Sequence, residues 1–139
     1  MWPLGFDGYG FGGWPLDLEG SLAEETLACT AELMPDGLVK YALGVGSPQN
    51  LVRCWQMGYR LFDCVLPTRV ARNGGLLTRH GRINLRNARF SEDPAPIEEG
   101  CDCYTCRHFS RAYLRHLLRA NEIFGLRLAT LHNLRFMLR

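Results

Sequence analysis

Three cysteines stand within six residues in the second half of the chain. Cys101, Cys103 and Cys106 have the spacing C-x-C-x2-C. Thiolates bind zinc strongly, and a tight loop can bring three of them around one ion. The competing interpretation, a set of buried or redox cysteines, is weaker because the surrounding stretch is polar. The spacing therefore predicts a structural zinc site.

A structural zinc site takes four ligands in a tetrahedron, so three cysteines predict a fourth donor, with histidine as the first choice. His108 follows the last cysteine by only two residues, where closing a tetrahedron is difficult. His116 and His132 lie on expected helices that could fold back onto the cysteine loop. The spacing alone does not choose between these two histidines.

Asp63 is the second residue whose position suggests chemistry. It lies at the C-terminal end of a predicted parallel strand, among apolar neighbours. Pockets of open α/β sheets and barrels gather at that edge. A buried carboxylate costs free energy unless it is paired or used. Asp63 is therefore either a catalytic carboxylate or an acid that pairs with a nearby arginine such as Arg69 or Arg72.

The charge of the chain is unevenly distributed. Residues 1–50 hold one base and seven acids, whereas residues 51–139 hold fifteen bases, all arginine, and seven acids. Arginine grips phosphate with a planar fork of two hydrogen bonds, so a basic half suggests a polyanionic partner. Thr68, Arg69 and Arg72 follow the strand end and suit phosphate or ribose contact. An ordinary solvated arginine-rich surface remains the alternative.

The composition is that of a globular domain. Hydrophobic residues make up 47% of the 139 residues and charged residues 22%, which excludes a disordered chain. The longest apolar runs are far shorter than the roughly 20 residues of a membrane helix. The N-terminus has no basic segment leading into an apolar one, so we expect no signal peptide and a cytoplasmic protein.

The first half of the chain alternates between strand and helix patterns. A helix over about residues 22–34 is expected to begin with a capping box of Ser21 and Glu24, with Leu22, Leu27 and Leu33 among its apolar positions. A second helix should begin at the Ser47-Pro48 cap and stop at Gly58. Strands are expected over residues 4–11, 40–46 and 60–65. Apolar strands joined by short links predict parallel βαβ units.

The second half differs in composition. Residues 66–100 are rich in Arg, Asn, Gly and Pro, with a hairpin turn expected at residues 79–81. Ser110 is expected to cap a helix that ends near Arg119. The last helix should span about residues 122–138 and turn four apolar side chains inward: Ile123, Leu126, Leu134 and Met137.

Several segments together resemble one family, the tRNA-guanine transglycosylases. The match runs through nearly the whole chain in the family's order, and the joint occurrence of the motifs is highly specific. Residues 62–69 and 71–74 resemble the nucleophile motif and the loop after it, and residues 83–89 the next segment. The cysteine cluster with residues 110–117 and 132–134 is similar to the zinc subdomain. Residues 6–13 and 41–46 resemble the two preceding strand ends.

The resemblance implies a role for each matched position. Asp63 would be the nucleophile that attacks the ribose carbon as guanine leaves, forming a covalent RNA–enzyme intermediate. A structural Zn2+ would be held by Cys101, Cys103, Cys106 and His132, which names the fourth ligand that spacing left open.

The same resemblance implies the substrates and partners. Gly12 and Gly13 would let the backbone approach the base, and Leu43 and Gly44 would line its pocket. Arg69 and Arg72 would contact the anticodon loop of the tRNA. The incoming base would be a 7-deazaguanine, and a homodimer or heterodimer partner is possible within the family.

The family fold is a (β/α)8 barrel with an inserted zinc-binding subdomain. Residues 1–65 would form its last three βα units, and residues 66–139 the RNA-contacting loop, the zinc subdomain and C-terminal helices. Three parallel strands cannot close a barrel, so we expect the chain to need the family's N-terminal half to turn over. The alternatives are a non-catalytic, zinc-stabilised tRNA-binding accessory module or a truncated paralogue.

Overall fold

The computed structural model describes residues 5–139. The first four residues, where the expected strand from residue 4 begins, lie outside that range. The chain forms two compact units, Met1–Val65 and Leu66–Arg139, and each unit has a hydrophobic core of its own. None of the helices between residues 5 and 139 has both the length and the apolar composition needed to cross a membrane.

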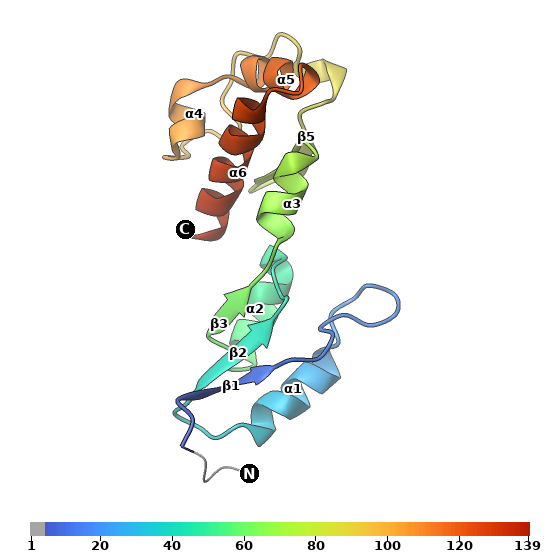
Figure 1. Ribbon diagram of the computed structural model, residues 1–139, viewed down its shortest axis with the longest axis vertical. Helices are drawn as coiled ribbons and strands as arrows, with labels where there is room; N and C mark the ends of the chain where they lie inside the picture. Colours follow the sequence, from blue (N-terminus) through green and yellow to red (C-terminus); the bar gives the residue numbers. More distant parts are fainter. Residues whose placement is uncertain (1–4) are drawn as a thin grey trace. The chain divides into compact units, whose positions relative to one another are not determined.

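A three-stranded parallel sheet organises the N-terminal unit (Figure 1). The strands lie in the order β1 (Gly8–Phe11), β2 (Val39–Leu43) and β3 (Leu61–Asp63), and they are connected by α1 (Glu24–Leu33) and α2 (Pro48–Gln56). The prediction of parallel βαβ units is therefore confirmed, with shorter strands than the sequence suggested.

The start of α2 follows the expected cap. Ser47 is extended, and its Oγ accepts a hydrogen bond from the backbone N–H of Asn50 at 3.2 Å, while Pro48 occupies the first turn. Proline suits this position because the first-turn N–H groups have no partner within the helix. Gly58 ends the segment with φ of +100°, a conformation that favours glycine.

The start of α1 differs from the expected capping box. The cap position is Ala23, without a side-chain hydrogen bond. Ser21 belongs instead to a turn in which Oδ1 of Asp17 accepts its backbone N–H at 2.8 Å. Glu24 forms an ion pair with Arg53 of α2. Because Ser21 belongs to the turn made by Asp17, it does not cap the helix, which begins at Glu24.

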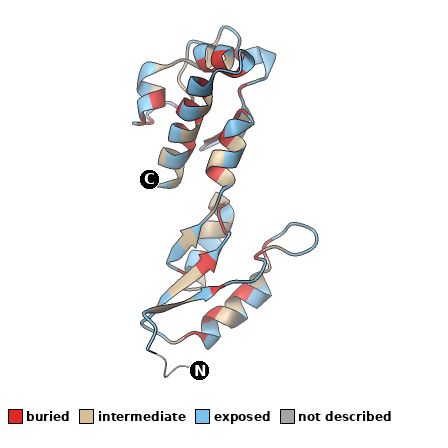
Figure 2. Cartoon of the chain, in the orientation of Figure 1, coloured by how far each residue is buried: buried red, intermediate tan, exposed pale blue. Residues whose placement is uncertain are grey.

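The core of the N-terminal unit lies between one face of the sheet and the two helices. Leu27 of α1, Ala42 of β2, Cys54 of α2 and Tyr59 are fully buried, and Figure 2 marks such residues in red. Of the apolar positions named for this helix, Leu27 is buried, whereas Leu33 at its end is 68% exposed. This core fixes which face of the sheet the helices cover.

The opposite face of the sheet is not covered by α1 or α2. Val39, Tyr41 and Leu43 alternate with buried Ala42 along β2, and Tyr41 and Leu43 pair with Leu61 and Asp63 of β3. Val39 and Leu61 are 48% and 50% exposed. Because side chains alternate between faces along a strand, Tyr41 and Asp63 share this uncovered face.

The C-terminal unit combines helices with one β-hairpin. Its elements are α3 (Leu66–Arg72), β4 (Gly75–Thr78), β5 (Gly81–Asn84), the 3-10 helix η2 (Ala88–Phe90), α4 (Tyr104–His108), α5 (Arg111–Arg119) and α6 (Ile123–Met137). The expected hairpin turn is confirmed by the antiparallel pairing of β4 with β5. The cap of α5 is confirmed as well, since Oγ of Ser110 accepts from the N–H of Tyr113 at 3.2 Å.

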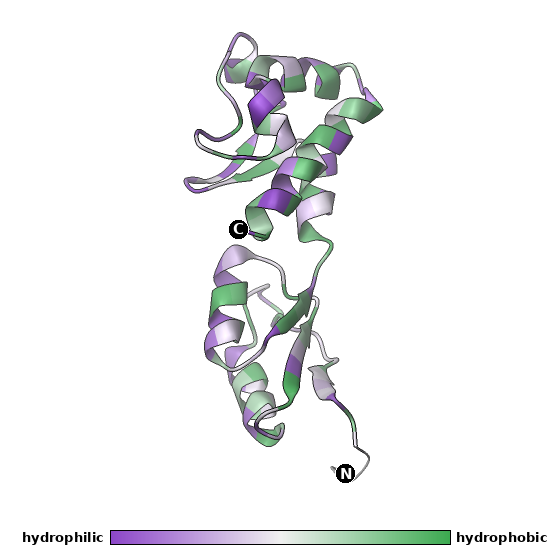
Figure 3. Ribbon diagram, turned by 90° about the vertical axis from the view of Figure 1, so that its left-hand side faces the viewer, coloured by the Kyte–Doolittle hydropathy of each residue, from purple (hydrophilic) through white to green (hydrophobic). Residues whose placement is uncertain are grey.

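The buried face of α6 agrees with the expected one at Leu126, which packs against the core, and differs at other positions. Ile123 is 80% exposed and Leu134 is 39% exposed, whereas His132 and Asn133 are fully buried with Leu128. In Figure 3, α6, the helix that ends beside the C label, carries hydrophobic and hydrophilic bands in alternation. Two polar residues with specific buried partners therefore set the inward face, which apolar periodicity alone did not reveal.

Candidate metal centre and sheet-edge carboxylate

Cys101, Cys103, Cys106 and His132 form one group in the C-terminal unit. Their ligand atoms all lie within 4.8 Å of one another. Nδ1 of His132 lies 3.9, 3.5 and 3.4 Å from the sulfurs of Cys101, Cys103 and Cys106. The loop is folded tightly, because Sγ of Cys103 accepts the N–H of Cys106 at the start of α4.

The imidazole of His132 is oriented from its far side. Nε2 lies 2.8 Å from the carbonyl oxygen of Leu77 on β4. A carbonyl accepts only, so Nε2 carries the proton and Nδ1 presents its lone pair to the three sulfurs. Burial lowers the pKa of His132, and this favours the neutral ring that a metal needs. A backbone carbonyl that orients a histidine is the usual outer partner of a metal ligand.

The donor set fits a tetrahedral zinc ion. With the usual Zn–S and Zn–N bond lengths, a tetrahedron places sulfur and nitrogen about 3.5 Å apart, close to the separations observed here. Burial raises the pKa of the Cys101 and Cys106 thiols, and the other cysteines of the group raise that of Cys106 further. A cation among these sulfurs would stabilise their thiolate forms. The group can therefore hold a metal ion.

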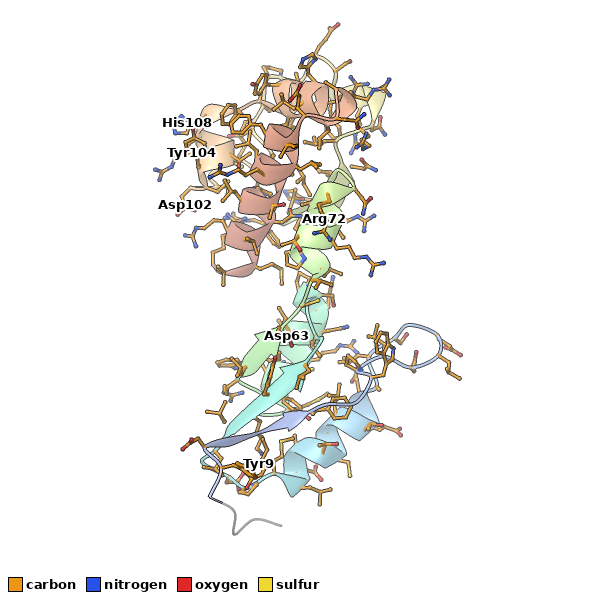
Figure 4. The ribbon with its side chains drawn as sticks, in the orientation of Figure 1. Tyr9, Asp63, Arg72, Asp102, Tyr104 and His108 are labelled. Atoms are coloured by element: carbon orange, nitrogen blue, oxygen red, sulfur yellow. The ribbon has the colours of Figure 1, made fainter. Side chains whose placement is uncertain are left out.

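Two further contacts tie the cysteine loop to α6. Asp102 accepts two hydrogen bonds from Arg135, from Nε at 2.9 Å and Nη2 at 2.7 Å. The hydrogen bond from Arg135 is the main cause that lowers the pKa of Asp102. The hydroxyl of buried Thr105 donates to the carbonyl of Leu128 at 2.7 Å. Asp102 is labelled in Figure 4.

The other two candidate histidines, His108 and His116, do not belong to the group of Cys101, Cys103, Cys106 and His132. The ring of His108 is exposed, with its centroid 4.6 Å from that of Tyr104, and both are labelled in Figure 4. His116 is exposed on α5. Of the two histidines that spacing left open, only His132 therefore joins the three cysteines.

Asp63, labelled in Figure 4, lies at the last position of β3. Its carboxylate accepts hydrogen bonds from Tyr41 and Gly44. The hydroxyl of Tyr41 donates to Oδ1 at 2.8 Å, and the backbone N–H of Gly44 donates to the same oxygen at 3.1 Å. Tyr41 and then Gly44 lower the pKa of Asp63, so this exposed side chain is ionised at neutral pH.

Tyr41 was not among the site residues predicted from the sequence. Its phenol pKa is raised, chiefly because its hydroxyl donates to Asp63. The residue is two positions before the end of β2, and its side chain therefore shares a face with Leu43, the partner of Asp63 in register. That spacing is the signal that could have found Tyr41, once the two strands were taken as parallel neighbours.

The other expected substrate-binding residues lie at the same edge of the sheet. Gly12 and Gly13 follow the end of β1, and Leu43 and Gly44 stand at the end of β2. An added Cβ at Gly12 would have no atom within 4 Å, and Gly44 has φ of +75°. The carboxyl ends of parallel strands meet at one edge, which is where pockets of such sheets form. The structure thus brings these glycines and Asp63 to a common edge.

Arg69 and Arg72 lie in the C-terminal unit, on α3, a helix that sequence analysis had taken as a loop. Both side chains are exposed, and Arg72 is labelled in Figure 4. Pro67 in the first turn was the available indication of a helix start. The three-residue spacing of the arginines places them on neighbouring positions of one helical face.

Comparison with known proteins gives one consistent result. The family model described as "Queuine tRNA-ribosyltransferase" matches residues 1–139. A queuine tRNA-ribosyltransferase of Symbiobacterium thermophilum is 52% identical over 136 residues, which cover 98% of this chain and 34% of the relative. Those of Staphylococcus haemolyticus and of Staphylococcus aureus strain JH9 are 48% and 47% identical, and the match covers 36% of each.

The chain thus spans about a third of the length of these relatives. The match extends through both units, from the sheet that carries Asp63 to the cysteine and histidine group. Family membership accounts for the mixed α/β architecture, since the resemblance identified on the motifs is to a barrel enzyme with a zinc subdomain. The chain belongs to the queuine tRNA-ribosyltransferase family, the tRNA-guanine transglycosylases.

Proposed function

We propose that this chain supplies the nucleophile and part of the RNA-binding surface of a tRNA-guanine transglycosylase. The enzyme would exchange guanine in a tRNA anticodon for a 7-deazaguanine base, in the cytoplasm. The observation that carries the proposal is the Asp63 carboxylate at the carboxyl edge of a parallel sheet, with one oxygen held by Tyr41 and Gly44. Active sites of barrel enzymes form at this edge.

The reaction would proceed in two displacements at the ribose C1′ of the target nucleotide. Oδ2 of Asp63 attacks C1′ while the bond from C1′ to N9 of guanine breaks, and guanine leaves with the bonding electrons and takes up a proton. The resulting ester is then attacked by N9 of the 7-deazaguanine, which loses its proton, and the carboxylate of Asp63 leaves. A carboxylate suits such a centre because it stabilises oxocarbenium character before it bonds.

The hydrogen bonds to Asp63 suit this role. Tyr41 and Gly44 both donate to Oδ1, so the carboxylate is oriented through that oxygen, and Oδ2 would make the attack. Their lowering of the pKa keeps the group ionised at neutral pH. A nucleophile must be deprotonated, and its geometry must be fixed before the substrate arrives.

The C-terminal unit would bind the tRNA. Arg69 and Arg72 on α3 would contact the anticodon loop. In the N-terminal unit, Gly12, Gly13, Leu43 and Gly44 would border the base. Cys101, Cys103, Cys106 and His132 would hold a structural Zn2+, which when bound cross-links the cysteine loop to α6. Two hydrogen bonds also hold the cysteine loop against α6: Arg135 donates to Asp102, and Thr105 donates to the carbonyl of Leu128.

A chimera tests the proposal. This chain would replace the corresponding third of the Symbiobacterium thermophilum relative, and incorporation of labelled guanine into tRNA would be measured. Asp63→Asn should abolish incorporation, whereas Asp36→Asn, a matched change at another exposed acid of the same unit, should not. Normal incorporation by the Asp63→Asn chimera would show that another residue is the nucleophile.

An accessory role is the second candidate, favoured by the arginine-rich C-terminal unit with a core and a metal group of its own. Such a module would bind tRNA without exchanging a base. A chimera that binds tRNA with normal affinity but incorporates no guanine would support this alternative.

A further inference from the structure

The face built from α3 and the β4–β5 hairpin carries positive charge without acidic neighbours in sequence. Residues 64–91 contain six arginines and no aspartate or glutamate. Within the C-terminal unit, Asp93 is paired with Arg111, Asp102 with Arg135 and Glu98 with Arg139. Glu98 also pairs with Arg79 at the turn of the hairpin, at 3.9 Å. Among the described residues, no acid forms an ion pair with Arg69, Arg72 or Arg82, so their charge is not neutralised within the unit.

A hollow of about 320 Å³ opens on this face. It is lined by residues of α3, β4 and β5 and of the turn between α3 and β4: Leu66, Arg69, Val70, Asn73, Gly75, Arg82 and Asn84. Arg69 and Arg82 enter it from different elements, and no described acid forms an ion pair with either. Two guanidinium groups beside one hollow repel each other, which an anion between them would relieve.

Gly75 makes room for the Arg82 side chain. A Cβ at position 75 would lie 3.3 Å from Nε of Arg82 and 3.1 Å from the carbonyl oxygen of Val70. The stem of Arg82 therefore lies against the backbone of β4, which restricts where its guanidinium can reach. Restricting a long side chain in advance reduces the entropy lost when a ligand binds.

Asn84 adds a neutral donor to the hollow. Its Oδ1 accepts the backbone N–H of Arg86 at 3.0 Å, which orients the amide. No described residue accepts from its Nδ2, so this donor is available to a ligand. On the other side, Nδ2 of Asn73 donates to the carbonyl of Arg69 at 3.0 Å and steadies the end of α3.

We propose that this hollow binds a phosphate of the RNA backbone, with Arg82, Arg69 and Asn84 as its donors. The inference rests on the proposed tRNA-binding function and extends the RNA surface from α3 onto β5. Guanidinium forks match the paired oxygens of a phosphodiester, and neutral amides complete such contacts. Because phosphate carries no sequence information, Arg82 contributes affinity for any tRNA rather than choice among them.

The test is salt-dependent binding of unmodified tRNA to the full chain with its metal. Arg82→Gln should weaken binding about 3- to 10-fold at low salt and reduce the slope of log affinity against log salt by about one unit. Arg82→Lys should keep most of the slope but lose part of the affinity, since it retains the charge without the fork. Arg119→Gln, which removes an exposed arginine from α5, is the matched control.

The outcomes separate the inference from the proposed function. If Arg69→Gln weakens binding and Arg82→Gln behaves like Arg119→Gln, the hollow on β5 is not a phosphate site while the α3 surface stands. If neither variant differs from Arg119→Gln, or if the chain does not bind tRNA, the proposed RNA surface fails with it. A loss that differs strongly between tRNAs of different sequence would overturn the assignment to phosphate. Metal content and circular dichroism confirm that each variant is folded.

Discussion

The hydroxyl of Tyr41 donates a hydrogen bond of 2.8 Å to Oδ1 of Asp63, from one strand of the parallel sheet to the next. The two residues are diagonal neighbours, because Leu43 rather than Tyr41 is the partner of Asp63 in register. A tyrosine is long enough to reach along that diagonal. The carboxylate therefore depends for its orientation on a residue 22 positions earlier in the chain.

Tyr41→Phe should shift the pH dependence of base exchange. The hydrogen bond favours the charged carboxylate and lowers the pKa of Asp63, so its removal should raise that pKa. The acid limb of the rate profile of the chimera should move to higher pH, with a smaller effect at neutral pH, where Asp63 remains ionised. Tyr113→Phe, at an exposed tyrosine of the other unit, is the control. An unchanged acid limb would mean that Tyr41 does not act on the ionisation of Asp63 in the reaction.

His132→Ala should abolish stoichiometric zinc binding by the purified chain. The variant removes the nitrogen that faces all three sulfurs, whereas His116→Ala removes an exposed ring from α5 and should leave zinc content unchanged. Elemental analysis measures the metal, and a chromophoric chelator measures how fast it is released. Because structural zinc adds directly to folding free energy, chelation should also lower the unfolding temperature of the original chain but not that of His132→Ala. Retention of zinc by His132→Ala would remove this residue from the ligand set.

Acid should destabilise the C-terminal unit partly through Asp93. The pKa of Asp93 is lowered chiefly by the hydrogen bond from the N–H of Ala95 and next by the hydrogen bond from Arg111. The side chain of Asp93 is 22% exposed and that of Arg111 is 25% exposed. A carboxyl with a depressed pKa in the folded state adds stability above its unfolded pKa of about 4, and that stability is lost as pH falls through the folded pKa.

Asp93→Asn should therefore cost about 1–2 kcal/mol at neutral pH and flatten the decline of unfolding free energy between about pH 5 and pH 2. Denaturant titrations across this range measure the effect. Glu92→Gln, at the exposed neighbouring residue, is the control and should leave the curve unchanged.

Gly46→Ala should disturb the sheet edge next to Asp63, the proposed nucleophile. An added Cβ would lie 2.1 Å from Cβ and 2.3 Å from Sγ of Cys64, the residue that follows Asp63. Such overpacking costs about 1–3 kcal/mol, so unfolding should occur at lower denaturant concentration. Gly12→Ala has no atom within 4 Å of the new methyl group and should leave stability unchanged. A second change, Cys64→Gly, should restore much of the stability lost by Gly46→Ala; if it does not, the clash is not the cause.

The alternation of strand and helix was predictable because local rules act at each boundary. Ser47 and Ser110 cap helices with their own side chains, and glycine at position 58 supplies the required positive φ. The helix α1 was misplaced because Asp17, outside the helix pattern, binds the N–H of Ser21. Local patterns therefore predicted the helices that carry clear cap residues, whereas α3, which was expected to be a loop, was missed.

The candidate site was predictable only where residue type limits the choice. Three clustered cysteines have few uses, so the metal group was apparent, but its fourth member required α6 to lie against β4. Tyr41 was not predicted because its contact with Asp63 depends on the register between β2 and β3, which the sequence does not specify. The inward face of α6 was misjudged because His132 and Asn133 are polar, and burial of polar groups is set by partners far away in the sequence.

Asn133 follows His132 on α6 and connects the group of Cys101, Cys103, Cys106 and His132 to the first turn of α3. Its Oδ1 accepts the N–H of Leu77 at 2.9 Å, and its Nδ2 donates to the carbonyls of Gly75 and Pro67 at 3.0 Å each. Two consecutive residues of α6 therefore have different partners: His132 faces the cysteine sulfurs, and Asn133 holds the first turn of α3. Oxidation of the cysteine sulfurs would displace His132 and, through the neighbouring Asn133, would weaken the hydrogen bond to Pro67. The start of α3 would thus lose order although none of its residues is chemically altered.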